Sequence, residues 1–151
     1  RNWTADRRTI EQTFGRLREN KVPVWLMSFP EGKRITPAKH EKSQQYARSK
    51  GVKPFSHVLM PRTKGFVASV IGLRKHVDAV YDFTIGYENG VPTLAQYVLG
   101  YVRRAHIHVR RYPIAELADK NEDLSAWLMD RFREKDALLA YFSQHRRFPD
   151  T

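Results

Sequence analysis

The chain contains 151 residues, 41% of them apolar, and this length favours one domain with a single core. Its 27 Lys and Arg against 16 Asp and Glu give a net charge of +11, so we expect an anionic partner such as nucleic acid, anionic lipid or a phosphorylated metabolite. The chain has no cysteine, which excludes disulfides, thiolate catalysis and zinc sites built on cysteine.

The first predicted helix covers residues 7–20, where apolar residues recur at the spacing of one helical face. Residues 22–29 follow as a short, almost continuous apolar run. Such a run is typical of a strand that is covered on both faces, as in a parallel sheet. This strand leads into residues 30–34, and ligands of α/β sheets bind at such strand ends.

A second helix is predicted over residues 36–51, with Thr36 as its N-cap and Pro37 at its first position. Its polar composition indicates an exposed helix. Residues 58–60 are predicted to form a second buried strand, which ends in the basic segment 61–65. The two basic strand ends can therefore converge on one ligand.

The second half of the chain gives two further strands and two further helices. Helical spacing occurs over residues 66–73, and residues 77–85 are rich in β-forming side chains. Residues 93–99 are too short to assign, and residues 105–111 alternate like a half-exposed strand. The strongest helical pattern spans residues 125–142. Together these elements predict an α/β fold with a mainly parallel sheet flanked by helices.

The segment Phe-Pro-Glu-Gly-Lys-Arg at residues 29–34 is the most informative for chemistry. Its proline and glycine bend the backbone, while Glu31, Lys33 and Arg34 present one carboxylate and two cations. Arg34 can offer a planar bidentate fork to phosphate, and Glu31 can orient that guanidinium or a substrate hydroxyl. From the residues alone, a phosphate site and an ordinary charged turn remain open alternatives.

This block resembles the Phe-Pro-Glu-Gly-Thr-Arg block of the lysophosphatidic acid acyltransferase (1-acyl-sn-glycerol-3-phosphate acyltransferase) family. Residues 59–66, Leu-Met-Pro-Arg-Thr-Lys-Gly-Phe, are similar to the branch of this family that includes lysocardiolipin acyltransferases. Further similar stretches lie at residues 39–51, 79–82, 109–111 and 125–128. The resemblance extends in order over nearly the whole chain. It implies that residues 1–151 are the C-terminal part of an acyltransferase domain, and we expect a fragment of a longer protein.

The resemblance implies a set of residues that bind the phosphate of the acyl acceptor: Glu31, Gly32, Lys33, Arg34, Arg62 and Lys64. Supporting roles are implied for Arg1, Pro30, Pro61 and Gly65. Lys33 replaces the family's threonine and exchanges a hydroxyl for a charge. Acceptor preference can change through this exchange, whereas phosphate binding should survive it.

The resemblance places catalysis outside this chain, in a histidine and an aspartate separated by four residues that precede these blocks. The histidine would act as general base on the acceptor hydroxyl, which attacks the acyl thioester, while the aspartate orients the imidazole. His145 and Asp150 have the same spacing, but they follow the phosphate-binding blocks, lie at the end of the chain and enclose Pro149. We therefore expect them to be non-catalytic and the chain alone to be inactive.

No metal site is expected. His106, His108 and Arg110 share one face of a predicted strand, and with no carboxylate in that stretch a solvated strand face is the better interpretation. The remaining histidines lie apart without ligand spacing. No bound cofactor is implied, and acyl-CoA enters as a co-substrate.

The implied partners are a lysophospholipid acceptor, acyl-CoA and a membrane surface, and the implied location is the endoplasmic reticulum membrane. No apolar run approaches the roughly 18 to 20 residues that cross a bilayer, so the anchors are expected outside this chain. Four arginines can face anionic headgroups or form a solubilising surface, and both alternatives stay open: Arg103, Arg104, Arg110 and Arg111.

Two other functions compete with the acyltransferase. A nucleic-acid-binding module would explain the positive charge, but the cations are spread along the chain without a recognisable motif, so we expect no nucleic-acid partner. A noncatalytic lipid-binding or regulatory fragment differs from the enzyme only in what precedes the chain. Presence of the histidine and aspartate motif upstream would favour the enzyme.

Overall fold

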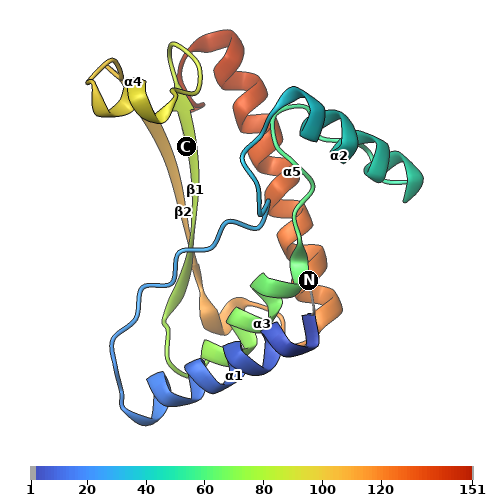
Figure 1. Cartoon of the computed structure of the whole chain (residues 1–151), viewed down its shortest axis with the longest axis vertical. Helices are drawn as coiled ribbons and strands as arrows, with labels where there is room; N and C mark the ends of the chain where they lie inside the picture. The colour runs from blue at the N-terminus through green and yellow to red at the C-terminus, as the bar shows by residue number, and fades with distance from the viewer. Residues whose placement is uncertain (1–2, 151) are drawn as a thin grey trace.

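The computed structural model describes the backbone of residues 3–150 and the side chains of residues 8–150. A long helix and a two-stranded hairpin run alongside each other, and the shorter helices gather at both ends of this pair (Figure 1). Within the described residues the elements follow in the order α1 (Trp3–Glu19), α2 (Pro37–Ser49), α3 (Thr63–Leu73), β1 (Ala79–Tyr87), α4 (Leu94–Val98), β2 (Ala105–Pro113), the 3-10 helix η1 (Ile114–Glu116) and α5 (Asn121–His145).

The four predicted helices are confirmed, although their ends are shifted. α2 begins as predicted, because Thr36 Oγ1 accepts a hydrogen bond from the backbone N–H of Lys39 at 3.4 Å. α5 is longer than the predicted 125–142. Two acidic residues favour its first turn, and the helix ends at Arg146, which adopts a left-handed φ of 57°. Residues 93–99 contain the short helix α4. None of the helices in the described part of the chain is long and apolar enough to span a membrane.

The sheet in the described residues is small and antiparallel, whereas the sequence predicts a mainly parallel sheet. β1 pairs with β2 along its whole length, from Ala79 opposite Pro113 to Tyr87 opposite Ala105. Both strands are predicted by the sequence, and they are the two members of the single sheet found in residues 3–150. The chain is therefore mixed α/β with a two-stranded sheet.

The strands predicted over residues 22–29 and 58–60 do not form. A strand needs a neighbouring strand to satisfy its N–H and C=O groups, and within the described residues neither segment has one. Residues 22–29 instead form an irregular connection in which Trp25 is 94% exposed and Met27 is 77% exposed. Residues 58–60 are largely buried, as predicted, but as a loop.

The core lies between α3 and α5 and is closed by the loop that precedes α3. Phe66 of α3 stacks on Trp127 of α5, with their ring centroids 5.6 Å apart. The buried residues of this core are all apolar: Phe55, Val58, Phe66, Val67, Val70, Ile114, Leu117, Leu124, Leu128 and Phe132. Burial of each large side chain of this kind stabilises the fold by about 1.5–3 kcal/mol.

One face of the hairpin packs against α5. Lys135 of α5 donates hydrogen bonds from Nζ to the Asp82 carboxylate at 2.8 Å and to Thr84 Oγ1 at 3.1 Å. Two positions further along β1, Gly86 allows the ring of Phe142 to approach the strand, because a Cβ at this position would lie 2.8 Å from ring atoms. The opposite face of the hairpin stays exposed and largely apolar.

Gly86→Ala is expected to lower the free energy of unfolding by about 1–3 kcal/mol, because the buried Phe142 ring would have to move. Denaturant unfolding of the chain measures this loss. Gly15→Ala is the matched control, since nothing lies within 4 Å of a Cβ there and alanine favours the interior of α1. Equal stability of the Gly86 variant and the wild type would contradict this account of the packing.

Candidate functional site

A groove of about 970 Å³ lies on the surface of the described part of the chain. Its walls come from four parts of the chain that are distant in sequence: α1, the connection at residues 26–33, α2, and residues 59–69 with the start of α3. The two sequence blocks at residues 29–34 and 59–66 thus meet on one surface, as the sequence predicts for the two basic segments.

Two hydrogen bonds join these blocks. The backbone N–H of Arg62 donates to the carbonyl oxygen of Pro30 at 2.8 Å. The backbone N–H of Leu59 donates to Glu31 Oε2 at 2.9 Å, in a partly buried position. Glu31 therefore holds the second block in place, whereas the sequence predicts that it orients Arg34 or a substrate hydroxyl.

Gly32 shapes the place where Arg62 crosses the first block. Its N–H donates to the Phe29 carbonyl oxygen at 2.8 Å and closes a tight turn, in which Gly32 adopts a left-handed φ of 63°. A Cβ at Gly32 would lie 3.5 Å from Arg62 Cδ and 3.8 Å from Arg62 Cζ. The guanidinium of Arg62 accordingly lies against the turn formed by Gly32.

One face of α2 contributes to the groove through Lys39, Lys42, Ser43 and Tyr46. Ser43 Oγ accepts a hydrogen bond from the backbone N–H of Met60 at 2.8 Å, which ties α2 to the second block. No binding role is predicted for these residues from the sequence. Their spacing of three, four and seven positions is the signal that could have found them, because it places all four on one side of a helix.

The groove is lined by both cationic and apolar side chains. Five cationic residues line it against a single carboxylate, that of Glu31: Lys33, Lys39, Lys42, Arg62 and Lys64. Apolar side chains line it as well: Ile10, Leu26, Met27, Phe29, Met60 and Phe66. α3 also begins here, and its N-cap residue, Arg62, makes no capping hydrogen bond with its side chain. The arrangement can bind a molecule that carries both a phosphate and an apolar chain.

Among the described residues, most of the predicted binding residues line this groove, and Arg34 does not. Those that do are Pro30, Glu31, Gly32, Lys33, Pro61, Arg62, Lys64 and Gly65. The side chain of Arg34 is not among the lining residues, and its backbone carbonyl accepts a hydrogen bond from Lys39 Nζ at 3.4 Å. Arg1 lies outside the described residues.

The loop before α3 is held from the opposite side by α5. The carboxylate of Asp136 accepts hydrogen bonds from the backbone N–H of Ser56 at 2.9 Å and of His57 at 2.6 Å. His40 Nε2 lies 3.1 Å from the carbonyl oxygen of Phe55. α5 and α2 together therefore fix the loop that leads into the second block.

The pair His145 and Asp150 does not form a site. His145 Nδ1 is 2.9 Å from the carbonyl oxygen of Tyr141, and its ring stacks on Tyr141 with centroids 4.0 Å apart. The Asp150 carboxylate lies 3.7 Å from the guanidinium of Arg147. Neither residue lines the groove.

The strand histidines are not a solvated face, which corrects the sequence interpretation. His108 is buried against Phe148, and His106 lies 3.0 Å from the carboxylate of Glu88, a partner the sequence analysis does not identify. The hydrogen bond from His106, opposed by partial desolvation and aided by Arg104, lowers the pKa of Glu88. Among the described residues, no group of three or more histidine or acidic side chains could hold a metal ion.

Comparisons with known proteins agree with the resemblance. Residues 96–151 match the family described as Acyltransferase C-terminus. The chain is 37% identical, over 99% of its length, to the probable 1-acyl-sn-glycerol-3-phosphate acyltransferase 5 of Arabidopsis thaliana, and 38% identical, over all of its length, to 1-acyl-sn-glycerol-3-phosphate acyltransferase delta of Homo sapiens. No solved structure was found to match it.

The chain is also 36% identical, over 92% of its length, to a third protein, 1-acyl-sn-glycerol-3-phosphate acyltransferase 2 of Brassica napus. The chain spans 40% of the length of the Arabidopsis and human relatives and 36% of the Brassica one. The similarity includes both blocks that form the groove. The chain is thus similar, over nearly all of its length, to a part of the 1-acyl-sn-glycerol-3-phosphate acyltransferases, and the resemblance seen in the sequence is confirmed.

Proposed function

We propose that the full-length protein transfers a fatty acyl group from acyl-CoA to a lysophospholipid, most simply to lysophosphatidic acid, which becomes phosphatidic acid. This chain supplies the surface that binds the acceptor. The chain alone is inactive, because the histidine and aspartate that the resemblance implies for catalysis are not among its residues.

The observation that carries this proposal is the meeting of the two sequence blocks in one groove that is both cationic and apolar. A lysophosphatidic acid headgroup carries a phosphate, and Arg62 can bind it with a planar pair of N–H donors while Lys33 and Lys64 add point charges. The apolar side chains of the same groove suit the acyl chain of the acceptor. A nucleic acid would use the cations but not this apolar surface.

In the proposed reaction, the residues of this chain bind and orient. Arg62, positioned against Gly32, and the lysines hold the acceptor phosphate, while Glu31 keeps the two blocks together through the N–H of Leu59. Fixing the phosphate orients the acceptor hydroxyl towards the general base and the thioester, and such positioning contributes strongly to catalysis. Arg34, implied by the resemblance, would join this set if its side chain turned into the groove.

We further propose that residues 22–29 become a strand of a mainly parallel sheet in the full-length domain. Their apolar sequence supports this proposal. So does the exposure of Trp25, Met27 and Phe29, because a cluster of large apolar side chains is unfavourable on a surface that faces water. As a separate point, we propose that the full-length protein lies at the endoplasmic reticulum membrane, through anchors outside this chain.

The test is acyl transfer from radiolabelled acyl-CoA to lysophosphatidic acid. We expect activity from the full-length protein and none from the 151-residue chain. His145→Ala in the full-length protein should keep wild-type activity, because His145 lies away from the groove. A full-length protein without transfer activity would overturn the proposal and favour a regulatory lipid-binding role, and an active 151-residue chain would overturn the assignment of catalysis to residues outside it.

A further inference from the structure

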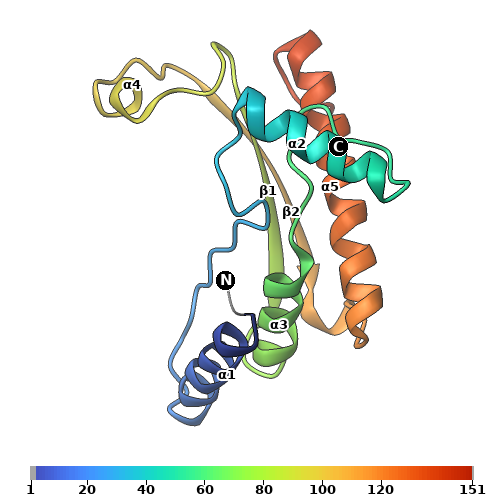
Figure 2. The same ribbon diagram turned by 45° about the vertical axis from the view of Figure 1, so that its right-hand side comes forward.

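The connection between β1 and β2 carries a cluster of exposed apolar side chains. It contains α4 and projects away from the rest of the molecule (Figure 2). No residue of α4 is buried. Six large side chains in this connection are between 61% and 75% exposed: Val91, Leu94, Tyr97, Val98, Leu99 and Tyr101. We call residues 91–101 the apolar tip.

The apolar tip is ordered by its own hydrogen bonds. Thr93 and Gln96 form a capping box, in which the Thr93 N–H donates to Gln96 Oε1 at 2.9 Å and the Gln96 N–H donates to Thr93 Oγ1 at 3.2 Å. Gly100 adopts a left-handed φ of 74° after the helix, and the Tyr101 N–H donates to the Gln96 carbonyl at 2.9 Å. The apolar side chains are thus presented outwards on a defined backbone, although none of α4 packs into the core.

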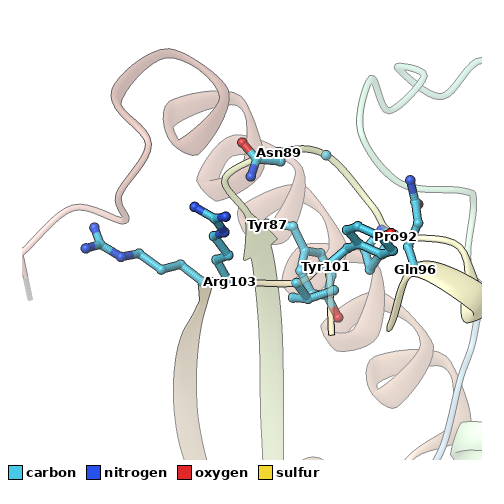
Figure 3. Close-up of a pocket in the computed structure, with 9 residues that line it drawn as sticks. Tyr87, Asn89, Pro92, Gln96, Tyr101 and Arg103 are labelled. Atoms are coloured by element: carbon cyan, nitrogen blue, oxygen red, sulfur yellow. The ribbon is translucent and has the colours of Figure 1, made fainter. Parts of the chain in front are cut away.

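The segment that follows the tip is cationic. Between Glu88 and Glu116 the sequence has no acidic residue and four arginines, of which Arg110 and Arg111 lie further along β2, opposite Asp82 and Tyr81. The other two, Arg103 and Arg104, come just after the tip and line a small cavity of about 70 Å³ with Tyr87 and Tyr101. Arg104 also lies 3.8 Å from the Glu88 carboxylate, and its side chain is 75% exposed. Figure 3 shows Tyr101 beside Pro92 and Gln96, with Arg103 just before β2. The cavity is too small for a substrate, but it places positive charge immediately behind the apolar tip.

We propose that the apolar tip docks on the surface of a bilayer that contains anionic phospholipid. Leu94, Val98 and Leu99 enter the boundary of the acyl chains, while Tyr97 and Tyr101 lie at the headgroup level, where amphipathic rings are favoured. Arg103 and Arg104 then face the anionic headgroups. Charge complementarity selects this occupant over a neutral apolar partner. The inference stands on this surface and does not depend on acyl transfer.

Absence of cysteine makes a direct test simple, since a single introduced cysteine reports one position. Val98→Cys, labelled with an environment-sensitive fluorophore, is expected to shift its emission to shorter wavelength with vesicles of phosphatidylcholine and phosphatidylserine. Brominated lipid should quench it. Lys50→Cys, labelled in the same way at the exposed end of α2, is the matched control and should show neither change. If the emission of the label at position 98 does not change when these vesicles are added, the proposal is wrong. A protein partner would then be the better explanation of the exposed apolar tip.

Vesicle co-sedimentation tests the chemistry of the contact. Leu94→Ser with Leu99→Ser should lower the vesicle partition coefficient about tenfold or more, because two exposed leucines no longer enter the bilayer. Arg103→Gln with Arg104→Gln should lower it several-fold and weaken its salt dependence. Lys50→Gln with Lys53→Gln removes the same charge elsewhere and should have a smaller effect. Equal binding to vesicles of phosphatidylcholine alone would overturn the anionic specificity, and unchanged binding of the leucine variant would overturn the docking site.

Discussion

Arg62→Ala in the full-length protein is expected to raise the KM for lysophosphatidic acid by about ten- to a hundredfold, the range that corresponds to one charged hydrogen-bonding contact with phosphate. Arg62 is the cation that both blocks position, through its N–H on Pro30 and its side chain against Gly32. Steady-state kinetics with the acceptor varied measure this effect. The KM for acyl-CoA should change little, because the loss concerns the acceptor phosphate.

Two companion variants separate charge from geometry. Arg62→Lys keeps the positive charge but loses the planar fork, so its acceptor KM should lie between those of the wild type and the alanine variant. Lys53→Ala removes a cation that does not line the groove and should leave the acceptor KM unchanged. The assignment of Arg62 fails if its alanine variant keeps the wild-type acceptor KM, and a larger effect from Arg34→Ala would transfer the main phosphate contact to Arg34.

Glu31→Ala is expected to accelerate hydrogen exchange of the Leu59 amide by about ten- to a hundredfold. The carboxylate accepts this N–H at a partly buried position, and an unsatisfied buried donor costs about 1–3 kcal/mol. Exchange measured by NMR on the chain itself reports this change without any activity. Glu31→Gln keeps an oxygen acceptor and should restore most of the protection.

The amide of His57 provides an internal reference, because it donates to Asp136 and not to Glu31. Its exchange should stay as in the wild type when Glu31 is replaced. A general acceleration across both amides would mean that the whole fold has been destabilised. Unchanged exchange at Leu59 would show that Glu31 does not hold the second block, and would return it to the role of contacting Arg34 or substrate.

Local patterns in the sequence predict the helices and the two strands well, since each depends on neighbouring residues, but they do not predict that the strands pair with each other. The capping by Thr36 and the apolar periodicity of α5 are examples. Sheet topology cannot be predicted from local patterns in the same way, because an apolar run becomes a strand only when another strand supplies its hydrogen bonds. Residues 22–29 have the composition of a strand but have no partner in the described part of the chain.

For the groove, the sequence predicts which segments take part. It predicts the contacts of each side chain less well. A local motif identifies residues 29–34 and 59–66, and both reach the groove. The role of Glu31 depends on Leu59, which lies 28 residues later, so local reasoning misses it. Lys39 and Lys42 escape notice for the same reason, since a polar helix is exposed unless the tertiary fold places another segment beside it.

Asp136 has a consequence for the order in which the groove forms. It is separated by 80 residues from Ser56, whose N–H it holds beside the second block. A contact between such distant residues forms late in folding, because a long loop must first be closed. During synthesis, the loop before α3 leaves the ribosome well before α5 does, and it cannot be fixed until Asp136 has followed. We therefore expect the groove to be fixed only after α5 has been synthesised, when all of the residues that line the groove have already been made.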